Sequence, residues 1–229
     1  VYNLGVTSRL QARHWDRGWL LGWRDVCRNT DERTLICDIL PRAAVGHTYP
    51  LALSPSDGLG CLYGNLTSFV LDYVARQKVA GAHLTYSYIN QLPVLPPDSY
   101  ETFAPWLVSS LNSWIESRVL ELTFTSWDMM PFSEYFRDEA PPFRWDEQRR
   151  ALIRAELDAA YFHLYDLGRG EVEHVMDSFD MLRRRETKPH EFGEFRTKRL
   201  ILERYDAMAD AIRTGVPYQT ILDPPPGHG

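Results

Sequence analysis

A proline-rich stretch, Pro93-Val94-Leu95-Pro96-Pro97-Asp98, constrains the fold of this 229-residue chain more than any other feature. Proline fixes its own backbone angle and donates no backbone hydrogen bond, so neither a helix nor a central strand continues through such a stretch. We therefore expect a boundary here between two folded regions, residues 1–97 and residues 98–216.

The two regions also differ in charge. The first contains nine Lys and Arg against seven Asp and Glu, whereas the chain after Pro97 contains sixteen against twenty-four. The net charge of −6 argues weakly against a nucleic-acid partner. Binding depends on the field of one face, however, and not on the sum over the chain. The strongest basic cluster lies within the acidic region, between Arg183 and Arg204.

The first region has the pattern of a small sheet with one helix. Residues 19–26 and 34–40 are short, rich in β-branched or aromatic side chains and bounded by turn residues, which predicts two strands. Apolar residues from Leu66 to Val74 recur with helical spacing and predict a helix over about 65–79 that packs on the sheet. Alternation over 84–89 predicts another strand.

Beyond the boundary the apolar period becomes helical. Stripes over 153–164 and 172–179 predict a helical hairpin across Leu167-Gly168, and residues 114–128 and 201–212 predict two further helices. We expect residues 217–229 to form a flexible tail. The predicted fold class is α+β, with a small mixed β-sheet and a packed helix followed by a mainly α-helical domain.

The sequence contains no motif of a known active site. Gly58-Leu59-Gly60 follows a predicted loop and lacks a third glycine, so we expect no cofactor site. The histidines show no zinc-binding spacing, and the three cysteines form no CxxC pair and are expected to be buried, so we expect no metal. Glu156 and Asp158 point to different sides of a predicted helix and are expected to face solvent.

Several strings, in order along nearly the whole chain, resemble adenine-specific DNA methylases. They match the target-recognition domain and C-terminal helical region of Type IIG restriction-modification enzymes and of the methylases of the BREX and DISARM phage-defence systems. The strings are residues 22–26, 30–36, 40–42, 65–78, 81–84, 89–97, 118–123, 155–165 and 193–202. The glycine-rich cofactor motif and the Asn-Pro-Pro-aromatic loop of that family do not occur here.

The resemblance implies a role in DNA specificity without catalysis. Residues 1–97 would be a target-recognition domain, truncated at its N-terminus, that binds double-stranded DNA sequence-specifically. The methyltransferase domain, with its S-adenosylmethionine, would belong to a parent protein that methylates adenine N6 and could also cleave DNA. The chain has no apolar run long enough to span a membrane and no signal peptide, so we expect a cytoplasmic protein with no membrane partner.

Basic side chains hold phosphates, while a few groups on loops reach base edges. The candidate phosphate contacts in the first region are Arg28, Arg33, Arg42, Arg76 and Lys78, the last two alternatively capping a helix. The candidate base-reading residues are His47, Thr48, Tyr49 and His83. A third set would grip flanking DNA, pack against the methyltransferase domain or simply face solvent: Arg183, Arg184, Arg185, Lys188, Arg196, Lys198 and Arg199.

Two other functions are compatible with the sequence. The acidic helical region also suits a protein–protein scaffold that joins the subunits of a restriction or phage-defence complex. A scaffold would show no salt-dependent DNA binding, which distinguishes it from a DNA-recognition module. An unrecognised enzyme is the third interpretation, and a deep pocket with perturbed carboxylates or a metal would support it.

Overall fold

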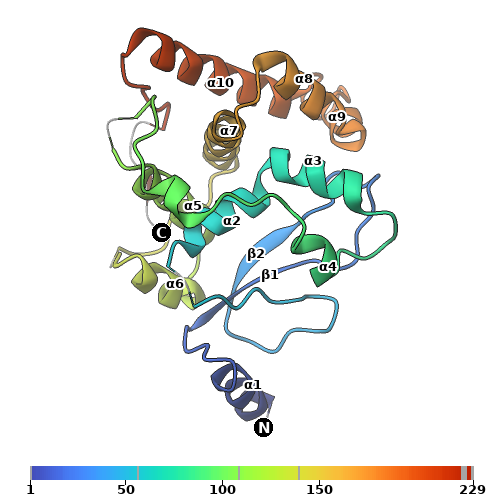
Figure 1. The fold of residues 1–229 in the computed structure, drawn as a ribbon, viewed down its shortest axis with the longest axis vertical. Coiled ribbons are helices and arrows are strands. Elements are labelled where there is room, and N and C mark those ends of the chain that lie inside the picture. Colours follow the sequence, from blue (N-terminus) through green and yellow to red (C-terminus); the bar gives the residue numbers. More distant parts are fainter. Residues whose placement is uncertain (1, 56, 108, 139, 223–225, 228–229) are drawn as a thin grey trace.

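The computed structural model describes residues 2–55, 57–107, 109–138, 140–222 and 226–227, and for residues 2–6 only the backbone (Figure 1). The fold is α+β and mostly helical, as predicted. In chain order the described elements are α1 (Tyr2–Gln11), β1 (Trp19–Trp23), β2 (Cys37–Pro41), α2 (Leu59–Thr67), α3 (Phe69–Lys78), α4 (Tyr86–Ile89), the 3-10 helix η1 (Pro97–Tyr100), α5 (Leu111–Thr123), the 3-10 helix η2 (Trp127–Met129), α6 (Met130–Tyr135), α7 (Glu147–Leu164), α8 (Arg169–Asp177), α9 (Asp180–Glu186) and α10 (Arg196–Thr214).

The sheet within the described part of the chain is a pair of antiparallel strands. Trp19 of β1 lies opposite Pro41 of β2, and Trp23 lies opposite Cys37. The free edge of β1 is covered by the loop after β2, which forms a single bridge between Gly22 and Leu51. A side chain at position 22 would lie 2.5 Å from the Pro50 carbonyl oxygen, so this close approach requires glycine. All five residues of β1 are buried.

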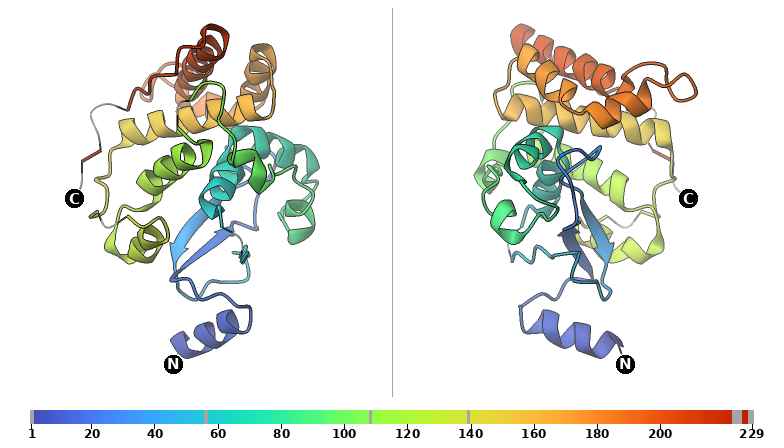
Figure 2. Two further views of the ribbon diagram at one scale, coloured as in Figure 1. Left: turned by 60° about the vertical axis from the view of Figure 1, so that its left-hand side comes forward. Right: turned by 90° about the vertical axis from the view of Figure 1, so that its right-hand side faces the viewer.

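Helix α7 forms the middle of the molecule. In both views of Figure 2, α8, α9 and α10 lie above it, the sheet lies below it and α1 lies at the lower end. Helix α7 packs on α10, α5 and α3, so it is buried on more than one face. This position places α7 between the sheet and the last three helices.

The two regions predicted from the proline-rich stretch share one hydrophobic core. Buried side chains from β1 and α2 belong to the same cluster as those from α5, α7 and α10. Polar contacts also cross between them, because Asp158 of α7 accepts the backbone N–H of Phe69 at 2.8 Å and Tyr165 binds Asn65. The division at residue 97 therefore stays a prediction about folding units.

Two local predictions were wrong. The helix predicted over 65–79 is two helices, because Ser68 has extended backbone angles and its hydroxyl caps the start of α3. Residues 84–89 do not form a strand: only His83 bridges Val26, and α4 begins at Tyr86. Tyr86 and Ile89 are three residues apart and line the same surface concavity, because residues at this spacing share one face of a helical turn.

The predicted flexible tail is anchored up to residue 222. Tyr218 is buried, and its backbone N–H donates to the carbonyl of Trp106 at 2.9 Å. Glu156, predicted to face solvent, is buried and accepts hydrogen bonds from Tyr218, Thr220 and Ile221. Asp158 is buried as well, because α7 is covered on both sides. Residues 223–225 and 228–229 of the tail lie outside the described residues.

Candidate nucleic-acid interface

A cleft with a volume of about 390 Å³ lies between the sheet side of the molecule and helices α7, α9 and α10. Five arginines and two carboxylates line it, together with apolar side chains. We call it the arginine cleft. Its charged residues are Arg33 before β2, Arg150, Arg154 and Asp158 of α7, Arg185 of α9, Arg196 of α10, and Glu32.

Arg150 and Arg154 lie four residues apart on α7, so their side chains share one face of the helix. No carboxylate of a described residue lies within ion-pair distance of either guanidinium. Burial lowers the pKa of Arg150, and the neighbouring charge of Arg154 lowers that pKa further. The two cations therefore repel one another, and the charges of Glu147 and Asp38 act on Arg150 only from beyond ion-pair distance.

The Arg150 side chain is held in place by neutral groups. Its Nη1 donates to the carbonyl of Leu122 at 2.9 Å, and its guanidinium lies 3.7 Å from the ring centre of Trp145. The residue is only 8% exposed, and its Nε has no hydrogen-bond partner among the described residues. Burying a charged group with an unpaired donor is costly unless a partner satisfies it. Arg150 therefore places a positive charge and an unsatisfied donor in the wall of the cleft.

The other cations of the cleft differ in how far they are neutralised. Arg33 pairs with buried Asp72 and donates to the carbonyl of Thr67, so most of its donors are used within the fold. Arg185 pairs with Glu32 at 2.7 Å, where both side chains are exposed. Arg196 lies 4.8 Å from the ring centre of Phe192 and forms no ion pair with a described carboxylate. Arg150, Arg154 and Arg196 are the cations of the cleft that form no ion pair with a described carboxylate.

Asp158 is the buried carboxylate of the cleft. Burial raises its pKa to about 6, although the charge of Arg33 and the hydrogen bond from the Phe69 N–H both act to lower it. The pKa shows that the nearby arginines do not fully offset the desolvation of this carboxylate. Above pH 6 Asp158 is therefore mostly ionised, and its charge offsets part of the positive charge of the cleft.

Arg150 and Arg154 line the cleft but were not among the DNA contacts predicted from the sequence. Their only sequence signal is four-residue spacing on a predicted helix, which is also typical of a solvated helix face. Of the predicted DNA contacts, the structure brings Arg33, Arg185 and Arg196 together in the cleft. They come from both regions of the chain, which the sequence could not place side by side.

Arg76 corrects one prediction. It is buried, and its Nη2 donates to the backbone carbonyls of Asp31 and Glu32, at 2.7 and 3.1 Å. Its guanidinium also stacks on the ring of Phe179. Arg76 therefore joins α3 to the loop before β2, and it is not free to hold a phosphate.

The remaining predicted cations are spread over the surface. Arg28, Arg42, Lys78, Arg184 and Lys188 are exposed. Arg183 pairs with Asp180, Lys198 pairs with Asp177 at 2.8 Å, and Arg199 pairs with Glu194 and Glu203. The basic run after α8 is therefore only partly available to a ligand, because carboxylates neutralise several of its members.

The predicted base-reading residues lie elsewhere. His47 and Tyr49 line a second concavity of about 700 Å³ between α1, the loop over residues 45–54 and α4, which we call the underside hollow. His83 is not part of it, and its Nδ1 lies 2.7 Å from Asp25. Thr48 is exposed, and its backbone carbonyl accepts a hydrogen bond from the backbone N–H of Asp25, just after β1.

The described residues include no group of three or more His, Cys, Asp or Glu side chains placed to hold a metal ion. Cys27, Cys37 and Cys61 are buried, as predicted. None of the described helices combines the length and apolar character needed to cross a membrane. Comparisons with models of known families, with curated proteins and with solved structures found no match.

Proposed function

We propose that the chain is a recognition module for double-stranded DNA, and that the arginine cleft contacts the phosphate backbone. The observation that carries this proposal is the set of Arg150, Arg154 and Arg196, which converge on one cleft without a carboxylate partner among the described residues. Guanidinium groups match the oxygens of a phosphate diester geometrically and stay charged at any physiological pH.

The energetics favour a polyanion over a single anion. Arginines from α7, α9 and α10 and from the loop before β2 are distributed around the cleft. A strand of DNA offers several phosphates in a row, and each one that is neutralised releases counterions and adds to the affinity. Loop residues outside the cleft then provide the contacts to base edges that specify sequence.

The resemblance to adenine-specific DNA methylases extends the proposal. In this interpretation the module selects the sequence that a separate methyltransferase domain modifies at adenine N6, and S-adenosylmethionine binds to that domain. Catalysis then resides outside these residues, and the protein works in the cytoplasm, where its substrate DNA is found.

The test measures fluorescence anisotropy of a labelled random duplex at 20–200 mM salt. We expect binding that weakens steeply with salt. Arg154→Glu should weaken it further and lower the magnitude of the log–log slope by about 0.9, the value for one phosphate contact. The matched control is Arg213→Glu, because Arg213 is exposed on the same helix as Arg196 and lies about 25 Å from it, at 1.5 Å per residue.

Two results would overturn the proposal. One is the absence of duplex binding even at 20 mM salt, where screening is weakest. The other is an equal loss of duplex binding in Arg154→Glu and Arg213→Glu. Binding would then depend on the net charge of the protein and not on the cleft. Absence of DNA binding together with capture of a folded partner subunit would favour the scaffold function instead.

A further inference from the structure

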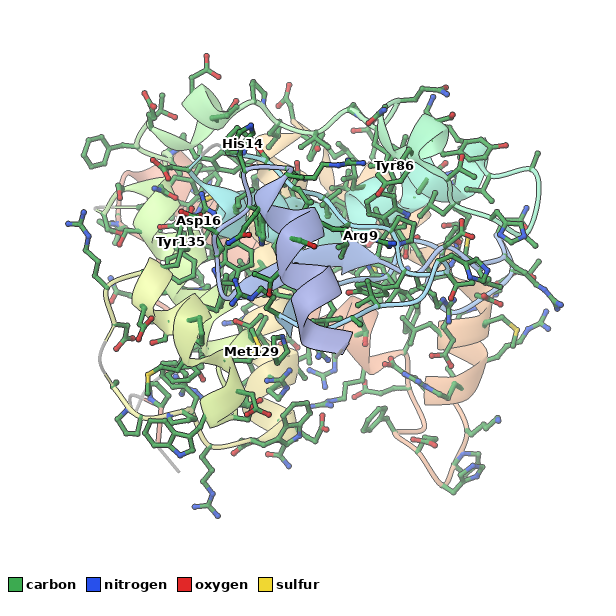
Figure 3. The ribbon with its side chains drawn as sticks, turned by 90° about the horizontal axis from the view of Figure 1, so that it is seen from below. Arg9, His14, Asp16, Tyr86, Met129 and Tyr135 are labelled. Atoms are coloured by element: carbon green, nitrogen blue, oxygen red, sulfur yellow. The ribbon has the colours of Figure 1, made fainter. Side chains whose placement is uncertain are left out.

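The underside hollow is lined by cationic and aromatic side chains together. Arg9 of α1 and Arg13, which follows that helix, line it with Tyr86, Ile89 and Asn90. Figure 3 shows Arg9 and Tyr86 on the same flank of α1, with Asp16 and Tyr135 on the opposite flank. No Asp or Glu among the described residues lines the hollow.

The ring of Tyr86 is fixed in an exposed position. Its hydroxyl donates to the carbonyl of Leu51 at 3.0 Å and accepts from the N–H of the same residue at 3.1 Å. The ring meets the buried indole of Trp23 edge-to-face, with ring centres 4.8 Å apart. The residue is nevertheless 52% exposed, which is unusual for an aromatic side chain held at both ends. The ring is therefore held by the fold while much of the residue stays accessible to a ligand.

Four polar side chains that line the hollow with this ring have no side-chain partner among the described residues. The guanidinium groups of Arg9 and Arg13, the imidazole of His47 and the amide of Asn90 make no side-chain hydrogen bond or ion pair with a described residue. They offer donors, an acceptor and two positive charges beside an aromatic surface. A planar, hydrogen-bonding and negatively charged molecule satisfies all of these at once.

We propose that the underside hollow binds an unpaired nucleotide, with its base stacked on Tyr86 and its phosphate held by Arg9 and Arg13. This inference rests on the proposed function, since it takes the base to belong to DNA. A base inside a duplex presents no free face, so it must leave the stack before an aromatic ring can hold it. The volume of about 700 Å³ lies within the range of small-molecule sites.

The experiment uses single-stranded DNA that contains one 2-aminopurine, whose fluorescence falls when the base stacks, with the intact duplex and free dAMP as further arms. We expect quenching in the single strand. Tyr86→Leu, which removes the ring and keeps an apolar side chain, should weaken binding about fivefold to 150-fold, equivalent to the 1–3 kcal/mol of one base–aromatic stack. Phe103→Leu is the matched control, because Phe103 is highly exposed and does not line the hollow.

A second variant guards against misfolding. Arg13→Glu changes an exposed side chain, and it should weaken both the single strand and dAMP while leaving the circular dichroism spectrum unchanged. Binding of dAMP as tight as that of the strand would support the site and identify a free nucleotide as its ligand. Binding of the strand alone would support it and identify the ligand as DNA.

The outcomes separate this inference from the proposed function. If Arg154→Glu weakens duplex binding while Tyr86→Leu and Arg13→Glu behave like Phe103→Leu, the arginine cleft stands and the hollow is no nucleotide site. If the hollow variants lose dAMP and the strand but no cleft variant affects the duplex, the nucleotide site stands and the backbone contact fails. Equal quenching by the wild type and Tyr86→Leu overturns the stacking itself.

Discussion

Arg118 and Arg150 occupy two similar positions and have opposite environments. Each is 8% exposed, lies less than 4 Å from a tryptophan ring centre and donates to one backbone carbonyl. Arg118 also binds Glu156, with its Nη2 2.6 Å from the carboxylate. Arg150 has no such carboxylate among the described residues. The fold therefore pairs one buried arginine with a carboxylate and leaves the other without an ion pair among the described residues.

This difference separates structure from ligand binding. A buried charge that keeps its partner contributes to a single packed arrangement, whereas one without a partner costs stability. Local violations of this kind concentrate at functional sites. We call the first arrangement the Glu156 junction, which consists of Arg118, Glu156, Tyr218, Thr220 and Ile221. The arginine cleft is its counterpart.

The largest effect should come from breaking the Glu156 junction. Glu156→Ala leaves Arg118 buried without a counter-ion and removes the acceptor of Tyr218, Thr220 and Ile221. We expect the free energy of unfolding to fall by about 3–5 kcal/mol, the cost of removing one partner of a buried pair. Urea unfolding measures this, with Glu173→Ala at an exposed ion pair as the control. If Glu156→Ala lowers the free energy of unfolding by less than 1 kcal/mol, the junction does not stabilise the fold, and the proposed difference from the cleft is wrong.

The next prediction concerns Asp158, and it asks whether this buried carboxylate stabilises the arginines of the cleft as Glu156 stabilises Arg118. Its pKa of about 6 in the folded state lies above the ordinary 3.8, so the folded state binds a proton more tightly than the unfolded state. Stability is then greatest below pH 4 for this group, and it falls as the pH rises from about 4 to about 6.

Asp158→Asn keeps an oxygen for the Phe69 N–H and removes the charge. We expect the variant to lose this pH dependence and to be more stable at pH 7 by at most about 3 kcal/mol, at 1.36 kcal/mol per pKa unit. Urea unfolding between pH 4 and 7.5 measures both effects. A variant that is less stable at every pH would show that Asp158 compensates the arginines as Glu156 compensates Arg118.

The sequence predicts the elements of this fold better than its polar contacts. The strands near residues 19–23 and 37–41 follow from short runs rich in β-branched or aromatic side chains, and the helices α5, α7, α8 and α10 follow from apolar residues at helical spacing. The break at Ser68 was missed, since the apolar stripe from Leu66 to Val74 continues across it. What ends the first helix is the extended backbone at Ser68, and the N–H of the following residue, Phe69, donates to Asp158, 89 residues away in the sequence.

The same limit applies to the candidate site. Glu156 and Asp158 were placed in solvent because they face different sides of one helix, but α7 is covered by α10 on one side and by α3 and α5 on others. Arg76 has the sequence context of a surface cation, and only its contacts with Asp31 and Glu32 show that it is internal. The role of an arginine depends on neighbours that are distant in sequence.

The smallest effect should come from Arg199, which forms more ion pairs than Arg118. Its guanidinium contacts Glu194 and Glu203, each at 2.8 Å, and these hydrogen bonds raise its pKa. All three side chains are nearly half exposed, so water screens the attraction, and holding them together costs side-chain entropy. We expect Arg199→Ala to change the free energy of unfolding by no more than about 0.5 kcal/mol. Urea unfolding of Arg199→Ala and of Glu156→Ala then compares two arginine sites that differ chiefly in burial. A loss from Arg199→Ala as large as that from Glu156→Ala would mean that the number of ion pairs, and not their burial, decides which arginines stabilise this fold.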